Sequence, residues 1–396
     1  MVNDLALQRN KYKHLSDEEW RWFLQQVEGR ERTADKLPTF AAIDDWWYPV
    51  RLSCEQCSSE ATARYKASLC QRSGLSAERS VSETVCQSAG RSLLDLTGGY
   101  GVDTYFLSEQ FTHTDYVEQN EELCRIAAHN FALSQKSKVE RQKLSIAIHN
   151  TTAEDFLLSS PCGEAGWGLI FLDPARRDSH GSKVFRIEDC TPNVVELLPT
   201  LLAHSKRLLI KLSPMLDLTQ AVTSLSQVNW DIHIVAIKNE VKEVLLLSGG
   251  TGQITTIDLA QKDQAFVFTR EEEQHCGLDI RDGKLANYLY EPNAAILKAG
   301  AYKLVAQRFG LHKLDVNTHL YTSRQFIENF PGRVWRITEK QNLKQANVLT
   351  RNYPLTPEQL KKKLHLRDGG TAFVIGCRVA GKPTLLYAER VYSTSM

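Results

Sequence analysis

The chain has 396 residues, of which 42% are hydrophobic and 24% charged, and its formal net charge is +1. This composition excludes collagen-like, low-complexity and wholly disordered proteins, and the length suffices for two to four domains of roughly 100–200 residues. No apolar run approaches the roughly 20 residues that cross a bilayer, and the first residues lack a basic stretch followed by an apolar core. We therefore expect a soluble, cytoplasmic protein.

Residues 1–84 are predicted to form an N-terminal helical region. Ser16-Asp-Glu-Glu is a typical helix start, and apolar residues follow it at spacings of three and four. A second helical stretch is expected at about 52–65, and residues 56–66 are polar for a core helix. The aromatic residues 46–48 lie between the two stretches, where packing between helices is their expected role.

The nine cysteines are an odd number spread over a long chain, which favours reduced, buried thiols over a disulfide framework. Cys54 and Cys57 form the one C-x-x-C pair of the sequence. A zinc site would need Cys70, Cys86 or a histidine as further ligands. We expect no metal.

Short apolar runs alternate with helical segments between residues 85 and 252. The predicted buried strands are 93–96, 116–118, 144–148, 169–172 and 208–212. The segments 102–108, 121–133, 153–158 and 194–202 are compatible with crossover helices. Strands that are apolar on both faces and separated by helices are typical of a parallel α/β sheet covered on both sides. Two further runs, 232–237 and 241–248, are too close for a helix between them and must be antiparallel.

A glycine-rich turn follows the first predicted strand, in Asp95-Leu-Thr97-Gly98-Gly99-Tyr-Gly101. Without Cβ atoms the backbone can approach a ligand closely at the carboxyl edge of the sheet. The turn lacks the Gly-Lys-Ser/Thr of a P-loop and does not fit G-x-G-x-x-G. Because Asp95 would repel a pyrophosphate, the turn favours a cationic or hydroxyl-rich ligand.

Acidic and amide side chains follow the next two strands. Glu118, at the tip of the second strand, is placed to accept hydrogen bonds from both hydroxyls of a ribose, and capping of the next helix is its alternative role. A residue after the third strand should face an adenine. The candidates are Asn150, Thr152, Glu154 and Asp155, and each of them could instead cap the following helix.

The fourth strand ends in Asp173-Pro174-Ala-Arg. Its apolar residues bring a carboxylate and a proline to the rim of the same cleft, where Asp173 and the carbonyl of Pro174 could hold an amine donor. A structural turn is the alternative interpretation.

The region after residue 252 has a different pattern and a strongly basic composition. A strand is expected at 254–259, a helix at 293–309 and another at 356–364. Residues 281–396 contain 19 Lys and Arg against 8 Asp and Glu, a charge of +11, so the other 280 residues carry −10. This asymmetry fits a region that faces a polyanion, and equally a solvated basic surface. The run Lys361-Lys-Lys is assigned by default to a solvated helix face.

The turn at Asp95–Gly101, Glu118 and Asp173-Pro-Ala-Arg together resemble class I S-adenosylmethionine-dependent methyltransferases over about residues 85–250. The resemblance implies a seven-stranded Rossmann-like sheet and S-adenosylmethionine as cofactor. It makes Glu118 the ribose ligand and Asp173 with Pro174 the substrate-side pair. The residues implied to contact the methionine part are Asp95, Thr97, Gly98, Gly99 and Gly101.

Three longer strings in the carboxyl-terminal part carry a closer resemblance. They are Tyr290-Glu-Pro-Asn-Ala-Ala-Ile-Leu-Lys-Ala-Gly-Ala301, His319-Leu-Tyr-Thr-Ser323 and Asn352-Tyr-Pro-Leu-Thr-Pro-Glu. They resemble bacterial methyltransferases with a ferredoxin-like segment and a C-terminal THUMP-like domain. The implied domains are the helical region 1–84, the methyltransferase domain 85–252, the ferredoxin-like segment 253–323 and the THUMP-like domain 324–396. Related THUMP domains bind RNA, so the resemblance implies an RNA partner.

The residues after Pro174 depart from the motif of methyltransferases that act on amino groups of bases. Amino-methylating enzymes of the Asn/Asp-Pro-Pro-aromatic type stack an aromatic ring on the target base, whereas Ala175 and Arg176 follow Pro174 here. Arg176 and Arg177 could stack on a base or pair with phosphate, and could equally pair with carboxylates of the protein. Lys211, after the fifth strand, could orient an acceptor or belong to a plain turn.

The sequence thus favours a methyltransferase that methylates a nitrogen of an RNA base, with a basic C-terminal region that helps to present the RNA. Two alternatives stay open. One is an RNA-binding protein with a vestigial cofactor site, and the other is a small-molecule methyltransferase.

Overall fold

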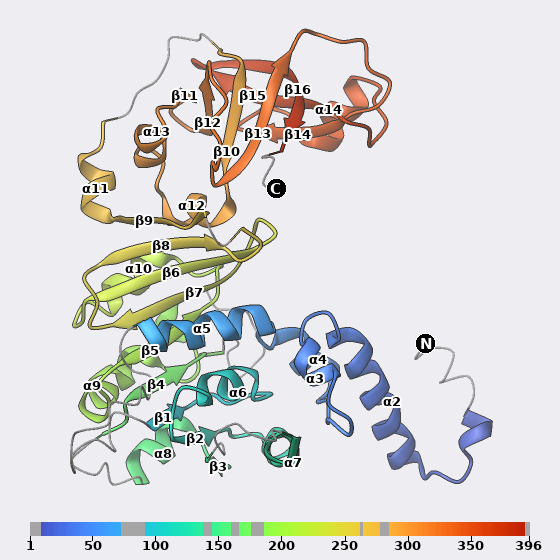
Figure 1. The fold of residues 1–396 in the computed structure, drawn as a ribbon, viewed down its shortest axis with the longest axis vertical. Coiled ribbons are helices and arrows are strands. Elements are labelled where there is room, and N and C mark those ends of the chain that lie inside the picture. The colour runs from blue at the N-terminus through green and yellow to red at the C-terminus, as the bar shows by residue number, and fades with distance from the viewer. Residues whose placement is uncertain are drawn as a thin grey trace. The chain divides into compact units, whose positions relative to one another are not determined.

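The computed structural model describes residues 9–72, 92–137, 145–159, 166–175, 186–261, 264–277 and 285–392. The chain divides into two compact units (Figure 1). The first unit comprises Met1–Val228 and Leu246–Gly249, and the second comprises Asn229–Leu245 and Gly250–Met396. None of the helices in these described ranges combines the length and the apolar character that spanning a membrane requires.

Five helical elements open the first unit. They are η1 (Arg9–Tyr12), α2 (Asp17–Thr33), α3 (Pro38–Ala41), α4 (Arg51–Gln56) and α5 (Glu60–Arg72). Ser16 caps α2 in a reciprocal capping box with Glu19. The single helix expected at about 52–65 is in fact two, α4 and α5. The hydroxyl of Ser59 accepts the N–H of Thr62 and so starts a new helix.

Five parallel strands lie in the described part of the first unit, and the expectation of a parallel α/β sheet is confirmed. The strands are β1 (Ser92–Asp95), β2 (His113–Val117), β3 (Ile146–His149), β4 (Leu169–Leu172) and β5 (Leu208–Leu212). Their order is β3-β2-β1-β4-β5, and the end of β7 (Glu240–Ser248) lies beside β5, where Ser248 Oγ accepts the N–H of Leu208 at 2.7 Å. Because the strands are parallel, the residues that follow them meet at one edge.

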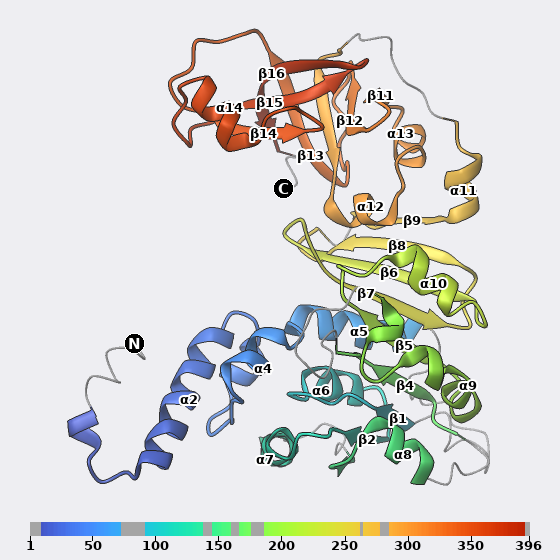
Figure 2. The ribbon, with the colours of Figure 1, turned by 180° about the vertical axis from the view of Figure 1, so that it is seen from behind.

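Helices connect these strands. They are α6 (Val102–Ser108), α7 (Glu121–Ser137), α8 (Ala153–Ser159), α9 (Val194–His204) and α10 (Leu218–Ser224), with the short η3 (Ile187–Asp189) before α9. Both views place α9 beside β4 and β5 (Figures 1 and 2). All four residues of β4 are buried, as expected for a central strand covered on both faces.

The N-terminal helical region shares a hydrophobic core with this sheet. The ring of Phe40 stacks on that of Trp46, with centroids 4.2 Å apart, and Trp46 Nε1 donates to the hydroxyl of Tyr100 at 2.9 Å. Asn130 of α7 accepts the backbone N–H of Trp47 at 2.8 Å and donates to its carbonyl at 2.9 Å. The aromatic residues 46–48 therefore pack against α6 and α7 as well as between the N-terminal helices.

The second unit begins with β6 (Trp230–Ile237) and β7, joined by the two-residue turn Lys238-Asn239. Both turn residues have positive φ, +51° and +64°, as an antiparallel hairpin of this length requires. β8 (Gln253–Asp258) pairs with β6 in parallel, and β9 (Phe266–Thr269) pairs with β8. β8, which follows residue 252, therefore continues the sheet to which β6 belongs. Helix α11 (Arg270–His275) follows β9.

A separate seven-stranded sheet forms the rest of the second unit, in the order β11-β12-β10-β13-β16-β15-β14. Its strands are β10 (Tyr288–Pro292), β11 (His312–Asp315), β12 (Thr318–Ser323), β13 (Gly332–Thr338), β14 (Asn347–Arg351), β15 (Ala372–Val379) and β16 (Lys382–Val391). Its helices are α12 (Ala294–Ala299), α13 (Leu304–Arg308) and α14 (Pro357–Lys363). The helix expected at 293–309 is broken, because Gly300 ends α12 with φ +79°.

Candidate functional site

The glycine turn between β1 and α6 is fixed by steric contacts beneath it. A Cβ at Gly98 would lie 2.2 Å from the ring of Tyr116, which is fully buried and cannot move aside. Gly101 has φ +82° and would place a Cβ 2.8 Å from Phe131. At Gly99 the nearest atom to an added Cβ is the carbonyl oxygen of Thr97, at 3.8 Å, so this side of the backbone is open.

Glu118 ties the end of β2 to this turn. One carboxylate oxygen accepts the N–H of Gly99 at 2.8 Å and the other accepts the N–H of Asn120 at 2.8 Å. The Tyr116 hydroxyl holds the same glycine by donating to its carbonyl at 2.6 Å. Each carboxylate oxygen can accept a further bond, so the half-buried Glu118 offers acceptors to hydroxyl groups beside an open stretch of backbone.

Asp95 is buried beneath the turn. Its two oxygens accept the N–H of Thr97 at 3.0 Å and the hydroxyl of Thr104 at 2.5 Å. Burial raises the pKa of Asp95 to about 7. Both oxygens thus accept bonds inside the protein and brace the turn, and the cofactor contact implied by the resemblance stays a prediction.

Thr97, Asp173 and Lys211 come together beside the turn. The N–H of Asp173 donates to the Thr97 hydroxyl oxygen at 2.6 Å, which joins the ends of β1 and β4. Lys211 Nζ forms a short ion pair with Asp173 Oδ2. The Asp173 side chain is 37% exposed and that of Lys211 12%, so the carboxylate can be reached from outside while the lysine lies behind it.

The residues that follow Asp173 are only partly described. Pro174 is buried. Arg176 and Arg177 lie outside the described residues.

The residues after β3 that are predicted to face the adenine have different hydrogen-bond partners from one another. Asn150 Nδ2 donates to the carbonyls of Glu118 and Gln119 at 3.0 and 3.1 Å, so it links the ends of β2 and β3. Thr152 and Asp155 bond to each other at the start of α8, which is the alternative capping role. Glu154 is half-buried in the first turn of that helix.

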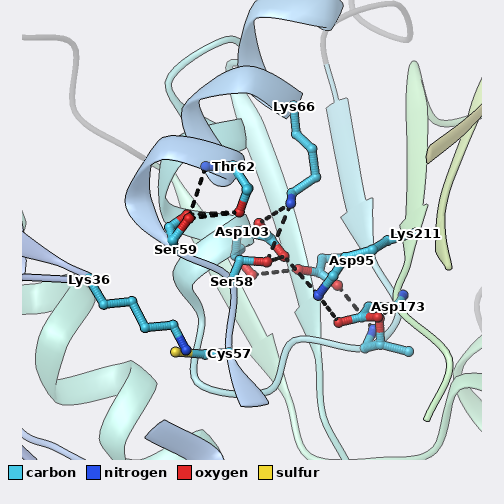
Figure 3. Close-up of polar contacts among 12 residues, drawn as sticks. Lys36, Cys57, Ser58, Ser59, Thr62, Lys66, Asp95, Asp103, Asp173 and Lys211 are labelled. Carbon is cyan, nitrogen blue, oxygen red and sulfur yellow. Dashed lines mark hydrogen bonds and ion pairs between the residues drawn. The ribbon is translucent and has the colours of Figure 1, made fainter. Parts of the chain in front are cut away.

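Three further polar residues join the site, and the sequence analysis gave them no role. Lys66 of α5 is fully buried, and its Nζ lies 3.1 Å from Asp103 Oδ1. The Ser58 hydroxyl donates to Asp103 Oδ2 at 2.6 Å. Lys211 Nζ lies 4.0 Å from the same Oδ2. Figure 3 shows Lys66, Asp103, Lys211 and Asp173 pointing toward one another.

The neighbouring lysines and Ser58 change the pKa of Asp103. Burial raises its pKa, but Lys66, Lys211 and Ser58 outweigh burial and lower the pKa below its ordinary value. The sequence signal that could have found Ser58 and Lys66 is the polar character of residues 56–66, which is unusual for a core helix.

The residues present fit S-adenosylmethionine. The open backbone at Gly99 can lie against the amino-acid part of such a molecule, and the Glu118 carboxylate can accept its ribose hydroxyls. Within the described ranges, no group of three or more His, Cys, Asp or Glu side chains is arranged to hold a metal ion. A shallow hollow of about 520 Å³ runs along Asp115, His149, Asn150 and Trp167, and the Asp115 carboxylate bonds to both His149 and Trp167.

Comparison with known proteins bears on the whole chain. A family model described as a ferredoxin-like domain matches residues 288–331, and one described as THUMP domain-like matches residues 332–390. A search of curated proteins found no match. A crystal structure of a protein from Porphyromonas gingivalis W83, assigned as a methyltransferase, aligns over 96% of this chain and 92% of that one, with 31% identity and a TM-score of 0.79.

Two other solved structures align over smaller parts. The tRNA (m1A58) methyltransferase of Aquifex aeolicus covers 49% of this chain and 69% of its own, with 13% identity and a TM-score of 0.31. A Streptococcus mutans protein assigned as a methyltransferase, in complex with S-adenosylhomocysteine, covers 40% and 87%, with 12% identity and a TM-score of 0.29. On the full-length similarity to the P. gingivalis protein and the two domain matches, this chain belongs to the class I S-adenosylmethionine-dependent methyltransferases that carry a ferredoxin-like and a C-terminal THUMP-like domain.

Proposed function

We propose that this protein transfers the methyl group of S-adenosylmethionine to a nitrogen of an RNA base. The observation that carries the proposal is the meeting of the glycine turn and Glu118 with the Asp173–Lys211 pair at one edge of the sheet. A cofactor held by the turn and Glu118 has its reactive end beside a partly exposed carboxylate.

Each proposed cofactor residue is assigned to one part of S-adenosylmethionine. Glu118 accepts the ribose hydroxyls, and the backbone of Gly98, Gly99 and Gly101 lies along the methionine part. Thr97 fixes the turn to β4, and Asp95 braces it from below. Asn150 is the candidate for the adenine side, ahead of Glu154 and Asp155, because it lies between the ends of β2 and β3.

Asp173 is the proposed catalytic residue. When bound, S-adenosylmethionine supplies an electrophilic methyl group and a neutral thioether leaving group. Asp173 orients the acceptor nitrogen by accepting its N–H, and takes the proton released as the nitrogen–carbon bond forms and the carbon–sulfur bond breaks. Lys211 fixes the carboxylate, and buried Pro174 shapes the rim. The protein accelerates the reaction mainly by holding the acceptor nitrogen and the methyl group in the right geometry, because the leaving group is already a good one.

The proposed partner is RNA. The +11 charge of residues 281–396 and the THUMP domain-like match at 332–390 support it. Arg176 and Arg177 are the proposed contacts near the acceptor, and Lys211 is proposed to orient the acceptor through the Asp173 carboxylate. We keep the proposed division into 1–84, 85–252, 253–323 and 324–396, and we place the protein in the cytoplasm, where the seven free cysteines of the described residues stay reduced.

The test uses full-length protein, S-adenosylmethionine with a labelled methyl group, and RNA from cells that lack the gene. Mass spectrometry of the hydrolysed RNA should show a labelled N-methylated nucleoside. Asp173→Asn should abolish transfer and keep S-adenosylhomocysteine binding. Label in a small molecule instead of RNA would support a small-molecule methyltransferase, and RNA binding without nucleoside binding would support a vestigial cofactor site.

A matched pair of variants tests the cofactor side by calorimetry. Glu118→Ala should lose most S-adenosylhomocysteine affinity, because it removes the ribose acceptor. Glu122→Ala, on the exposed face of α7 where Glu122 pairs with Arg125, should bind as the parent protein does. Equal affinity in both variants would remove Glu118 from the cofactor site.

A further inference from the structure

We infer that Ser58 and Lys66, from the N-terminal helical region, are positioning residues that hold Lys211 on Asp173. The inference rests on the proposed function, because it gives these residues a role through the proposed catalytic carboxylate. They act by compensating the negative charge of Asp103, which would otherwise draw Lys211 away.

Lys211 lies between two carboxylates. Its Nζ pairs closely with Asp173 Oδ2 and stands 4.0 Å from Asp103 Oδ2. Asp103 is much the more buried of the two, with its side chain 10% exposed against 37% for Asp173. A buried carboxylate needs compensation more strongly than an exposed one. An unsatisfied Asp103 would therefore compete successfully for the Lys211 ammonium group.

The helical region supplies that compensation. Lys66 Nζ neutralises Asp103 Oδ1 from 3.1 Å, and the Ser58 hydroxyl bonds Oδ2, the oxygen nearest Lys211, at 2.6 Å. Lys66 Nζ also lies 3.3 Å from the Ser58 hydroxyl oxygen, so the two residues act together.

Asp95 is the third carboxylate nearby. Its oxygens accept bonds from Thr97 and Thr104. Among the ion pairs of the described residues, Lys211 is shared between Asp103 and Asp173, and we infer that Ser58 and Lys66 favour the pair with Asp173.

Ser58→Ala tests this directly, with Ser59→Ala as its matched control. Ser58→Ala leaves Asp103 Oδ2 without its hydroxyl donor, so Lys211 Nζ should move onto Asp103 in a crystal structure. The kcat for RNA methylation should fall about tenfold or more, since small misplacements of catalytic groups have effects of this size. KM and S-adenosylhomocysteine affinity should be unchanged, because the glycine turn and Glu118 are not touched.

Ser59 bonds Thr62 and caps α5 without reaching Asp103. Ser59→Ala should therefore lower the melting temperature and keep both kcat and the Lys211–Asp173 pair. If both variants lose kcat in proportion to stability, or if Lys211 keeps its pairing with Asp173 in Ser58→Ala, the inference is wrong.

Lys66→Met gives a second, larger perturbation, and the double variant Lys66→Met/Asp103→Asn controls it. The single variant should transfer Lys211 to Asp103 and lower kcat. The double variant removes the competing charge as well, so it should recover the Lys211–Asp173 pair and most of kcat. A double variant no better than the single one would overturn the inference. The position of Lys211 in crystal structures of these variants tests the inference even if the protein methylates no RNA. Absence of RNA methylation would contradict only the proposed function.

Discussion

The residue types at positions 95 and 98 are determined by the buried side chains that pack behind the glycine turn. Gly98 cannot carry a side chain because Tyr116 fills the space beneath it, and Asp95 bonds to Thr97 and Thr104 in the interior. Glu118, in contrast, faces the turn from the side and keeps its acceptors available. Asp95 and Gly98 thus brace the turn, whereas Glu118 is the residue proposed to contact a ligand.

The buried carboxyl of Asp95 predicts a pH dependence of stability. Its pKa is raised from 3.8 to about 7, chiefly by burial. Between about pH 4 and 7 the folded chain therefore holds a proton at this residue that the unfolded chain has released. The free energy of unfolding contributed by Asp95 falls as pH rises, by about 1.4 kcal/mol per pH unit in this window, and levels off above pH 7.

Asp95→Asn isolates this contribution. The free energies of unfolding of both proteins, measured by urea denaturation from pH 4 to 8, should differ by an amount that shrinks with rising pH. A difference that does not change between about pH 5 and 8 would mean that Asp95 is ionised in the folded protein throughout that range.

Helix α7 anchors the N-terminal helical region through Asn130. The amide is 1% exposed and satisfies both backbone polar groups of Trp47. Asn130→Ala should cost about 1–3 kcal/mol of stability and speed proteolysis within residues 9–72. Ser134→Ala on the same helix is the control, because that hydroxyl bonds only locally to the carbonyl of Phe131. Identical cleavage rates in the two variants would refute this anchoring role.

Most elements of the first unit could be predicted because each depends on local sequence. The expected strands at 169–172 and 208–212 have the observed bounds, and so does the helix at 102–108, since apolar runs and glycines mark their ends. The break between α4 and α5 was missed, because the capping preference of Ser59 was hidden within one long polar segment.

The site could be predicted only where it follows a strand end. The glycine turn, Glu118 and Asp173 were found this way, and the structure brings Thr97, Asp173 and Lys211 together. Lys66 and Ser58 reach the edge from a helix packed over the sheet. Sequence spacing does not report such a tertiary approach, so their part in the site needed the structure.

At the scale of the whole molecule, the charge asymmetry predicts RNA binding that weakens steeply with salt. Lys362 and Lys363 are exposed on α14, whereas Lys361 is paired with Asp368 at 2.6 Å. Replacing Lys362 and Lys363 with Gln should weaken binding to single-stranded RNA and reduce the slope of log affinity against log salt by about 1.4 if both contact phosphate.

Replacing Lys11 and Lys13 with Gln makes the same change in net charge outside residues 281–396, and should leave the slope as it is. Filter binding at several salt concentrations measures both variants. Equal slopes in the two double variants would show that the basic run on α14 is a solvated helix face.

The central claim is that one nucleoside is held at the carboxyl edge of the sheet, and a crystal structure with S-adenosylhomocysteine tests it most directly. We predict the ribose hydroxyls on the Glu118 carboxylate, the amino-acid part along the backbone of 97–101, and the sulfur facing Asp173. A nucleoside bound elsewhere, or none bound at millimolar concentration, would contradict the account.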